Sequence, residues 1–335
     1  MLLNKEDIER FSKMIEESDN IVLLSHFNPD GDAMGSTVAL YRFLQNLGKK
    51  NLTIIYPNEY PHNFSFLFEG INHIISSNGL LVAKQTVKQA DLLIYMDLNK
   101  ISRTCEELES TLNSLSTPKV LIDHHIDPEQ FDISFSDSKA SATAELTYKI
   151  IKQIDATKLD IKIAQAIYTG ICTDTGSFSY SCSRRDCFDV VAELVEFGLE
   201  IAPLKRQVFD LSSENRLKLL GYLLSEKLRV FPQHKAAYIS VSKQELRQFN
   251  FQKGDLEGVV NYCLKIEGIE SSEYDKYSYI ALYNSSKELY AVYWMTDLQK
   301  AVVLTAESYS LRGFRAQYDQ KSLTKGASRS VGRRS

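Results

Sequence analysis

The sequence lacks an excess of positive charge: 39 Lys and Arg stand against 43 Asp and Glu, and the formal net charge is −4. This balance excludes the extended basic surface that long duplex DNA requires, so any nucleic-acid partner should be short. Cysteine is also rare, and its five copies form neither a disulfide framework nor a paired CxxC zinc pattern. A reducing cytoplasm is therefore the expected location.

Long hydrophobic runs are absent as well. No stretch approaches the roughly 18 apolar residues of a membrane span. The opening segment, MLLNKEDIER, becomes charged too early for a secretory signal. We therefore expect no membrane association. With 44% hydrophobic residues among 335, the chain is long enough for two domains.

What the sequence does contain is an alternation of short apolar runs with amphipathic patterns. Four runs, each bounded by turn residues, predict buried strands: 21–24, 52–56, 92–96 and 120–122. Four amphipathic patterns predict helices: 5–17, 140–154, 160–172 and 187–197. A further helix is expected to open at Gly35. The alternation predicts an α/β fold with a mostly parallel sheet, in which ligands bind beyond the carboxyl ends of the strands.

The character of the sequence changes near residue 199. We expect a catalytic domain over 1–198, a helical connector over 199–225 and a smaller α/β domain over 226–320, with the active-site cleft between the two domains. Tyrosine-rich segments in the smaller domain are typical of an antiparallel sheet. The final segment, 321–335, is basic and poor in apolar residues, which predicts disorder.

Acids and histidines gather where four of these predicted elements end. They supply eight candidate site residues: His26, Asp30, Asp32, Asp97, Asp123, His124, His125 and Asp174. Because the carboxyl ends of parallel strands meet at one edge of a sheet, the four clusters can converge there. Carboxylates crowded in this way are stable together when divalent cations neutralise them. A second interpretation remains open for Asp30 and Asp32, which could simply cap the following helix.

The types of ligand indicate which metal chemistry to expect. Histidine and carboxylate ligands without thiolates favour Mn²⁺, with Mg²⁺ or Co²⁺ as substitutes. Six of the eight candidates, taken as ligands, exceed the number that one catalytic zinc needs. They suit two metal ions about 3.5 to 4 Å apart that share a carboxylate. Such a pair activates a water and binds the oxygens of an in-line displacement at phosphorus. The sequence therefore predicts phosphoester hydrolysis.

The four motifs, in this order across roughly residues 18 to 185, resemble the DHH phosphoesterase superfamily, whose name matches the triplet at 123–125. The resemblance implies two metal ions bridged by Asp97. It implies that the first ion is held by His26, Asp30 and Asp97. It implies that the second is held by Asp32, Asp97, His124 and Asp174.

The resemblance also implies roles for residues around the metals. His125 would contact the scissile phosphate and either stabilise its charge or protonate the leaving oxygen. Asp123 would orient a histidine. Arg103, six residues after Asp97, matches a family arginine and would bind a substrate phosphate. Its other interpretation is a solvated arginine at the start of a helix.

Within the superfamily, the segments SENRLKLLGYLL (213–224) and DLEGVVNY (255–262) resemble the bacterial nanoRNase group, whose second domain is of the DHHA1 type. That group hydrolyses oligoribonucleotides a few nucleotides long and dephosphorylates 3′-phosphoadenosine 5′-phosphate. The resemblance therefore implies short RNA or a nucleoside bisphosphate as the substrate. It also allows a homodimer.

Two other functions remain open. An enzyme with the same metal site could act on inorganic pyrophosphate or polyphosphate, although PDGDA (29–33) differs from the PDTD pattern of the pyrophosphatase branch. Alternatively, the protein could bind nucleotides without catalysis. The sequence contains no GGGH segment, which the nanoRNases use to hold the nucleotide.

Overall fold

The computed structural model divides the chain into two compact units, Met1–Leu211 and Ser212–Ser335. The described residues are 4–179, 182, 184–210, 212–231, 236–239, 241–252, 254–256, 258–263, 265–267, 278–283, 289–295 and 301–305. The predicted tail, 321–335, lies outside them. The limits of the predicted connector and of the second domain stay predictions.

A six-stranded sheet forms the centre of the first unit. Its strands are β1 (Asn20–Leu24), β2 (Asn51–Tyr56), β3 (His73–Ile75), β4 (Leu92–Met96), β5 (Lys119–Asp123) and β6 (Ile133–Ser136). The strand order is β3-β2-β1-β4-β5-β6 and every neighbouring pair is parallel, which confirms the predicted α/β fold. The order reverses between β1 and β4, and such a switch point is where parallel sheets bind ligands.

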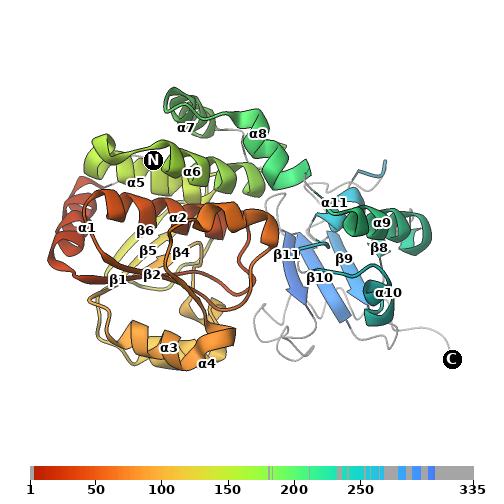
Figure 1. Cartoon of the computed structure of the whole chain (residues 1–335), viewed down its shortest axis with the longest axis horizontal. Coiled ribbons are helices and arrows are strands. Elements are labelled where there is room, and N and C mark those ends of the chain that lie inside the picture. Colours follow the sequence, from red (N-terminus) through yellow and green to blue (C-terminus); the bar gives the residue numbers. More distant parts are fainter. Residues whose placement is uncertain are drawn as a thin grey trace. The chain divides into compact units, whose positions relative to one another are not determined.

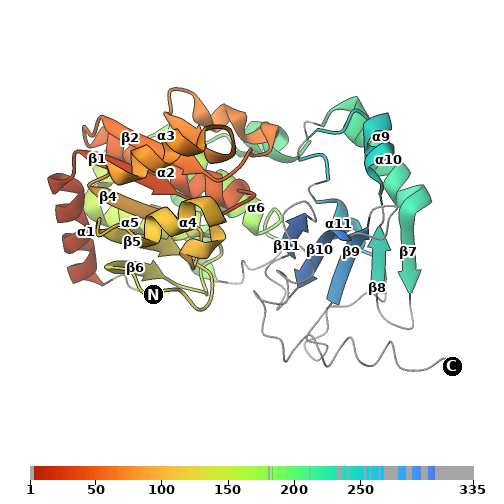
Figure 2. The same ribbon diagram turned by 90° about the horizontal axis from the view of Figure 1, so that it is seen from below.

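Helices cover both faces of this sheet (Figure 1). On one face lie α1 (Lys5–Glu17), α2 (Gly31–Asn46), α5 (Thr143–Asp155), α6 (Ile161–Asp174), α7 (Arg185–Glu196) and α8 (Ile201–Lys205). On the other face, turned toward the viewer in Figure 2, lie α3 (Ser76–Lys88) and α4 (Glu106–Asn113). Short 3-10 and π segments complete the unit: η1 (His62–Phe68), η2 (Ile101–Arg103), η3 (Ala156–Lys158) and η4 (Arg206–Asp210). Within the described residues, no helix is both long enough and apolar enough to cross a lipid bilayer.

Strand β1 shows why the sequence reads as continuous apolar runs. Successive side chains of a strand point to opposite faces. Ile21 and Leu23 therefore pack in the core under α2, whereas Val22 and Leu24 pack against α3 and α4. Because both faces are covered, the four buried positions after Asn20 are all hydrophobic.

The helix after β1 begins at Gly31, so the prediction that Gly35 opens it is wrong. The Asp30 side chain accepts hydrogen bonds from the N–H groups of Asp32 and the next residue, both at 3.0 Å, and caps the helix. Gly35 instead lies where α2 packs against α6. A Cβ at Gly35 would lie only 2.4 Å from the carbonyl oxygen of Ala166. This glycine therefore permits close packing of two helices.

The second unit has its own core and contains antiparallel strands, as the tyrosine-rich segments predicted. A two-stranded sheet joins β7 (Leu228–Phe231) and β8 (Ala236–Ile239). A three-stranded sheet has the order β11 (Ala301–Thr305), β10 (Leu289–Met295), β9 (Ser278–Tyr283). The helical segments are α9 (Glu214–Tyr222), η5 (Leu223–Lys227), α10 (Lys243–Gln248) and α11 (Val259–Cys263). Leu219, Leu223, Ile239 and Leu246 are buried together in its core.

Candidate metal centre

The predicted site residues converge at the carboxyl edge of the six-stranded sheet, beside the switch point between β1 and β4. His26 follows β1, Asp97 follows β4 and His124 follows β5, while Asp174 is the last residue of α6. Three groups offer ligand atoms within 4.8 Å of one another: His26, Asp30 and Asp97; Asp97, His124 and His125; and Asp32, His124 and Asp174. These side chains come from elements far apart in the sequence, and the packing of α2 and α6 on the sheet brings them together.

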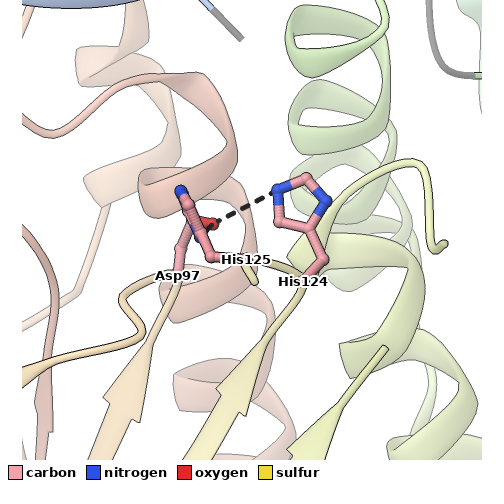
Figure 3. A group of neighbouring side chains, drawn as sticks. All are labelled: Asp97, His124 and His125. Carbon is pink, nitrogen blue, oxygen red and sulfur yellow. Dashed lines mark ion pairs between the residues drawn. The ribbon is translucent and has the colours of Figure 1, made fainter. Parts of the chain in front are cut away.

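Asp97 belongs to two of these groups, and Figure 3 shows it beside His124 and His125. Its Oδ2 lies 3.4 Å from Nε2 of His26, whereas its Oδ1 lies 3.7 Å from Nε2 of His124. The two oxygens of one buried carboxylate thus face different groups. Asp97 has a φ of 58°, in the left-handed region that Asp tolerates better than most residues, and this conformation turns the chain at the end of β4.

Backbone carbonyls determine which ring nitrogen of His26 and of His124 faces the carboxylates. Nδ1 of His26 lies 2.9 Å from the carbonyl oxygen of Phe27, and Nδ1 of His124 lies 3.2 Å from that of Ala140. Each Nδ1 can donate a proton only to its carbonyl, so the neutral ring presents the lone pair of Nε2 to the carboxylates. Metal-binding histidines have this arrangement in most proteins.

The distances between donor atoms fit a shared ion better than direct hydrogen bonds. Nε2 of His124 lies 3.3 Å from Oδ2 of Asp174 and 3.7 Å from Oδ2 of Asp32. Charge-assisted N–H···O bonds are shorter, about 2.7 to 2.9 Å. Two ligand atoms that lie about 2.1 Å from one ion at right angles are about 3 Å apart. Imidazoles and carboxylates without a thiolate are also the donors that hard divalent cations prefer. The residues therefore fit a divalent metal.

Crowded negative charge shifts the pKa values of the site. Asp32 is only 1% exposed, and burial together with the charges of Asp97, Asp174 and Asp30 raises its pKa well above the ordinary value. Burial alone would lower the pKa of His26, but hydrogen bonds to Asp30 and Asp97 outweigh it and raise the pKa to about 9. A bound cation would relieve the repulsion among the acids, since it becomes the largest local charge.

Asp30 combines the two interpretations that the sequence left open. The oxygen that caps α2, Oδ1, also lies 3.9 Å from Nε2 of His26. Partial removal from water opposes ionisation of Asp30, whose side chain is 50% exposed, but the hydrogen bond and the charge of His26 lower its pKa below the ordinary value. A cap and a metal ligand are thus compatible at this position.

Asp123 lies outside the three groups and holds His125 instead. Its Oδ2 accepts a hydrogen bond of 2.9 Å from the main-chain N–H of His125, and its Oδ1 lies 2.6 Å from Nδ1 of the same ring. Asp123 is fully buried, so this double contact restricts the orientation of the imidazole. The geometry matches the orienting role that the resemblance implied, and that role stays a prediction.

Arg103, at the end of η2, lies beside the same edge of the sheet. Its carbonyl oxygen accepts a hydrogen bond of 2.7 Å from the N–H of Phe27, and its charge is close enough to lower the pKa of His26. Its Nη1 is buried and has no hydrogen-bond partner within the described part of the chain. A buried donor of this kind is costly unless a ligand accepts from it. This favours a phosphate-binding arginine over a solvated one.

The N-terminus of α5 contacts two of the aspartates, although no motif of the sequence indicated it. The N–H groups of Thr143 and Ala144 donate to Oδ2 and Oδ1 of Asp32, at 2.7 and 2.9 Å. The hydroxyl of Thr143 donates to Oδ1 of Asp97 at 2.8 Å. Backbone donors have no residue signature, so the threonine of SATAE (141–145) was the only available signal.

Comparison with known proteins connects this chain with one protein family and with several sequence relatives. Residues 20–171 match the DHH family, N-terminal domain. The chain is 28% identical over 262 residues to the probable bifunctional oligoribonuclease and PAP phosphatase NrnA of Streptococcus mutans, which covers 76% of this chain and 77% of the relative. It is 23% identical over 257 residues to the bifunctional oligoribonuclease and PAP phosphatase NrnA of Bacillus subtilis, which covers 76% of each.

Among solved structures, an exopolyphosphatase-related protein from Bacteroides fragilis matches with a TM-score of 0.81 and 26% identity, over 97% of this chain and 98% of that one. Its name differs from those of the sequence relatives. The resemblance that the four motifs carry is confirmed by the match of residues 20–171 to the DHH family, N-terminal domain.

Proposed function

We propose that this protein is a metal-dependent phosphoesterase that hydrolyses short oligoribonucleotides to mononucleotides and dephosphorylates 3′-phosphoadenosine 5′-phosphate. The observation that carries the proposal is the convergence of carboxylates and imidazoles in three groups, of which two share Asp97. Relatives named as bifunctional oligoribonucleases and PAP phosphatases, which match about three quarters of the chain, support the choice of substrate. Short RNA or a nucleoside bisphosphate, and not long duplex DNA, is the partner proposed. The homodimer and the cytoplasmic location stay predictions.

Two Mn²⁺ ions are the proposed cofactors, with Mg²⁺ or Co²⁺ as substitutes. One ion would be held by His26, Asp30 and Asp97. The other would be held by Asp32, Asp97, His124 and Asp174. Such a pair, when bound, activates a water for attack at phosphorus and stabilises the charge that develops there. Asp97 suits the bridging position because its two oxygens face different groups.

His125 is the proposed partner of the scissile phosphate. The contact between its Nδ1 and Oδ1 of Asp123 stabilises the imidazolium form and restricts the ring. An imidazolium in this position can stabilise negative charge on the phosphate or donate a proton to the leaving oxygen. We expect His125→Gln to lower turnover far more than it lowers the affinity for Mn²⁺, because Gln removes the proton donor and leaves the proposed ligands in place.

Arg103 is the proposed contact for a phosphate of the substrate, because its buried Nη1 offers a donor that the described residues do not satisfy. Arg103→Gln should raise KM more than it lowers kcat. Arg103→Lys should recover only part of the affinity, since an ammonium group cannot bind a phosphate in a bidentate manner.

A second candidate is hydrolysis of inorganic pyrophosphate or polyphosphate with the same metal site. The match to the exopolyphosphatase-related protein from Bacteroides fragilis supports it. A third candidate, of another class, is a nucleotide-binding protein without catalysis, which the missing GGGH segment supports. The three candidates differ in the products they release.

A substrate panel separates them. The full-length protein, loaded with Mn²⁺, is incubated in parallel with a diribonucleotide, 3′-phosphoadenosine 5′-phosphate, pyrophosphate and polyphosphate. We expect mononucleotides from the first, phosphate from the second, and no product after EDTA treatment. Phosphate release from pyrophosphate or polyphosphate alone would establish the second candidate. Nucleotide binding without any turnover would establish the third.

A further inference from the structure

We propose that Thr143 is a positioning residue that sets the orientation of Asp97 and Asp32 for metal binding. The inference rests on the metal site proposed above and adds a residue that is not itself a ligand. Thr143 is the first residue of α5 and is fully buried, with 0% exposed. Its hydroxyl contacts Asp97, which follows β4, and its N–H contacts Asp32, which lies in the first turn of α2.

The hydroxyl of Thr143 determines how the carboxylate of Asp97 is turned. The terminal torsion of an aspartate is broad, so a carboxylate by itself has no strongly preferred plane. The hydrogen bond of 2.8 Å from Thr143 holds Oδ1 on the side of His124. With Oδ1 held there, Oδ2 points to His26, 3.4 Å away. This orientation would suit a carboxylate that bridges two ions with one oxygen directed to each.

The backbone of Thr143 acts on Asp32. Its N–H donates to Oδ2 at 2.7 Å, and the N–H of Ala144 donates to Oδ1 at 2.9 Å, so both oxygens of Asp32 are held. These N–H groups belong to the first turn of α5, where the helix carries partial positive charge that favours a carboxylate. The two contacts keep Asp32 beside His124, whose Nε2 is 3.7 Å from Oδ2.

A buried glutamate holds the segment that carries Thr143. Oε2 of Glu145 accepts hydrogen bonds from the N–H of Ser141 at 2.9 Å and from its hydroxyl at 2.7 Å. Nζ of Lys149 lies 2.6 Å from Oε1 and offsets the buried charge. In the same segment, the carbonyl oxygen of Ala140 lies 3.2 Å from Nδ1 of His124. The entrance to α5 therefore supports both a histidine and the aspartates of the site.

Two substitutions of Thr143 test the role of its hydroxyl. Thr143→Val removes the hydroxyl at nearly constant volume and keeps the N–H, whereas Thr143→Ser keeps both. Mn²⁺ affinity is measured by calorimetric titration of the metal-free, full-length protein without substrate. We expect Thr143→Val to weaken binding of at least one Mn²⁺ by about 10- to 100-fold, the usual effect of losing a residue that orients a ligand. Thr143→Ser should bind Mn²⁺ like the wild type.

Thr147→Val is the matched control. Thr147 lies one turn later in α5, is also fully buried, and donates its hydroxyl to the carbonyl oxygen of Thr143 at 2.9 Å. Its substitution removes a buried hydroxyl without touching a carboxylate, so Mn²⁺ affinity should not change. Thermal unfolding of each variant separates a loss of affinity from a loss of fold. If Thr143→Val does not fold, Thr143→Ala, which also lacks the hydroxyl and adds no bulk, replaces it.

The outcomes distinguish this inference from the proposed substrate. If Thr143→Val binds Mn²⁺ as tightly as the wild type, or is weakened no more than Thr147→Val, the positioning role is refuted. A wild type that binds Mn²⁺ but hydrolyses only pyrophosphate would overturn the substrate and leave the role of Thr143 intact. A wild type that binds no Mn²⁺ would overturn the metal centre and this inference with it.

Discussion

Replacement of Gly35 by alanine should separate two helices that carry proposed metal ligands. Asp32 lies in the first turn of α2, and Asp174 is the last residue of α6. A Cβ at Gly35 would lie 2.4 Å from the carbonyl oxygen of Ala166 and 2.7 Å from the amide nitrogen of Gly170. Both obstacles are backbone atoms, so no rotation of a side chain can relieve the contact.

Two opposing effects set the size of the destabilisation. Alanine is favoured over glycine inside a helix by about 1 kcal/mol. Overpacking a core costs about 1 to 3 kcal/mol, and this contact belongs at the upper end because carbon and oxygen normally approach to about 3.3 Å. The helices must therefore move apart by roughly 1 Å. We expect a net loss of about 2 kcal/mol, which lowers Tm by about 4 to 8 °C in a unit of this size.

Thermal unfolding of the metal-free protein measures this loss, and Mn²⁺ titration reports whether Asp32 and Asp174 still bind together. Gly221→Ala is the matched control, since Gly221 lies in α9 and a Cβ there meets nothing within 4 Å. It should stabilise its helix by up to about 1 kcal/mol. A Gly35→Ala variant that melts at or above the wild-type temperature would refute the close-packing explanation.

Three further measurements address the site. Mn²⁺ at about 100 times Kd should raise the free energy of unfolding of the wild type by about 2.7 kcal/mol per site. Asp97→Asn should lose this stabilisation and all hydrolysis. Asp127→Asn, which replaces a side chain that is 81% exposed, should keep both. In the metal-free protein, the stability that protonated His26 contributes is fully present below its ordinary pKa of 6.5 and is lost as pH rises through about 9. Urea unfolding across this pH range should show the decline in the wild type and not in His26→Asn. Glu145→Gln should destabilise the fold by about 1 to 2 kcal/mol, because Lys149 loses its nearest carboxylate and keeps that of Asp186, 2.9 Å away, and unfolding of the double variant with Lys149→Met should show part of that stability recovered.

Much of the first unit follows from local patterns. The buried positions of strands such as β1 and β4 form continuous apolar runs because both faces of the sheet are covered, and this makes the strands recognisable without any knowledge of their neighbours. The acids and histidines that follow the strands are also recognisable, because chain direction alone places the carboxyl ends of parallel strands at one edge of the sheet. The predicted residues His26, Asp97 and His124 lie together there.

Contacts between distant segments decided the rest. Gly35 suggests a helix start because glycine interrupts a pattern locally. The structure instead explains this glycine by its close packing against Ala166 of α6, 131 positions later along the chain. Thr143 acts through one hydroxyl and one N–H, and nothing in its neighbourhood along the chain indicates the aspartates that receive them. The buried Nη1 of Arg103 is visible only once the turn after β1 is folded against η2. Residue types reveal which groups could bind a metal; their orientation depends on hydrogen bonds that form only when separate elements pack together.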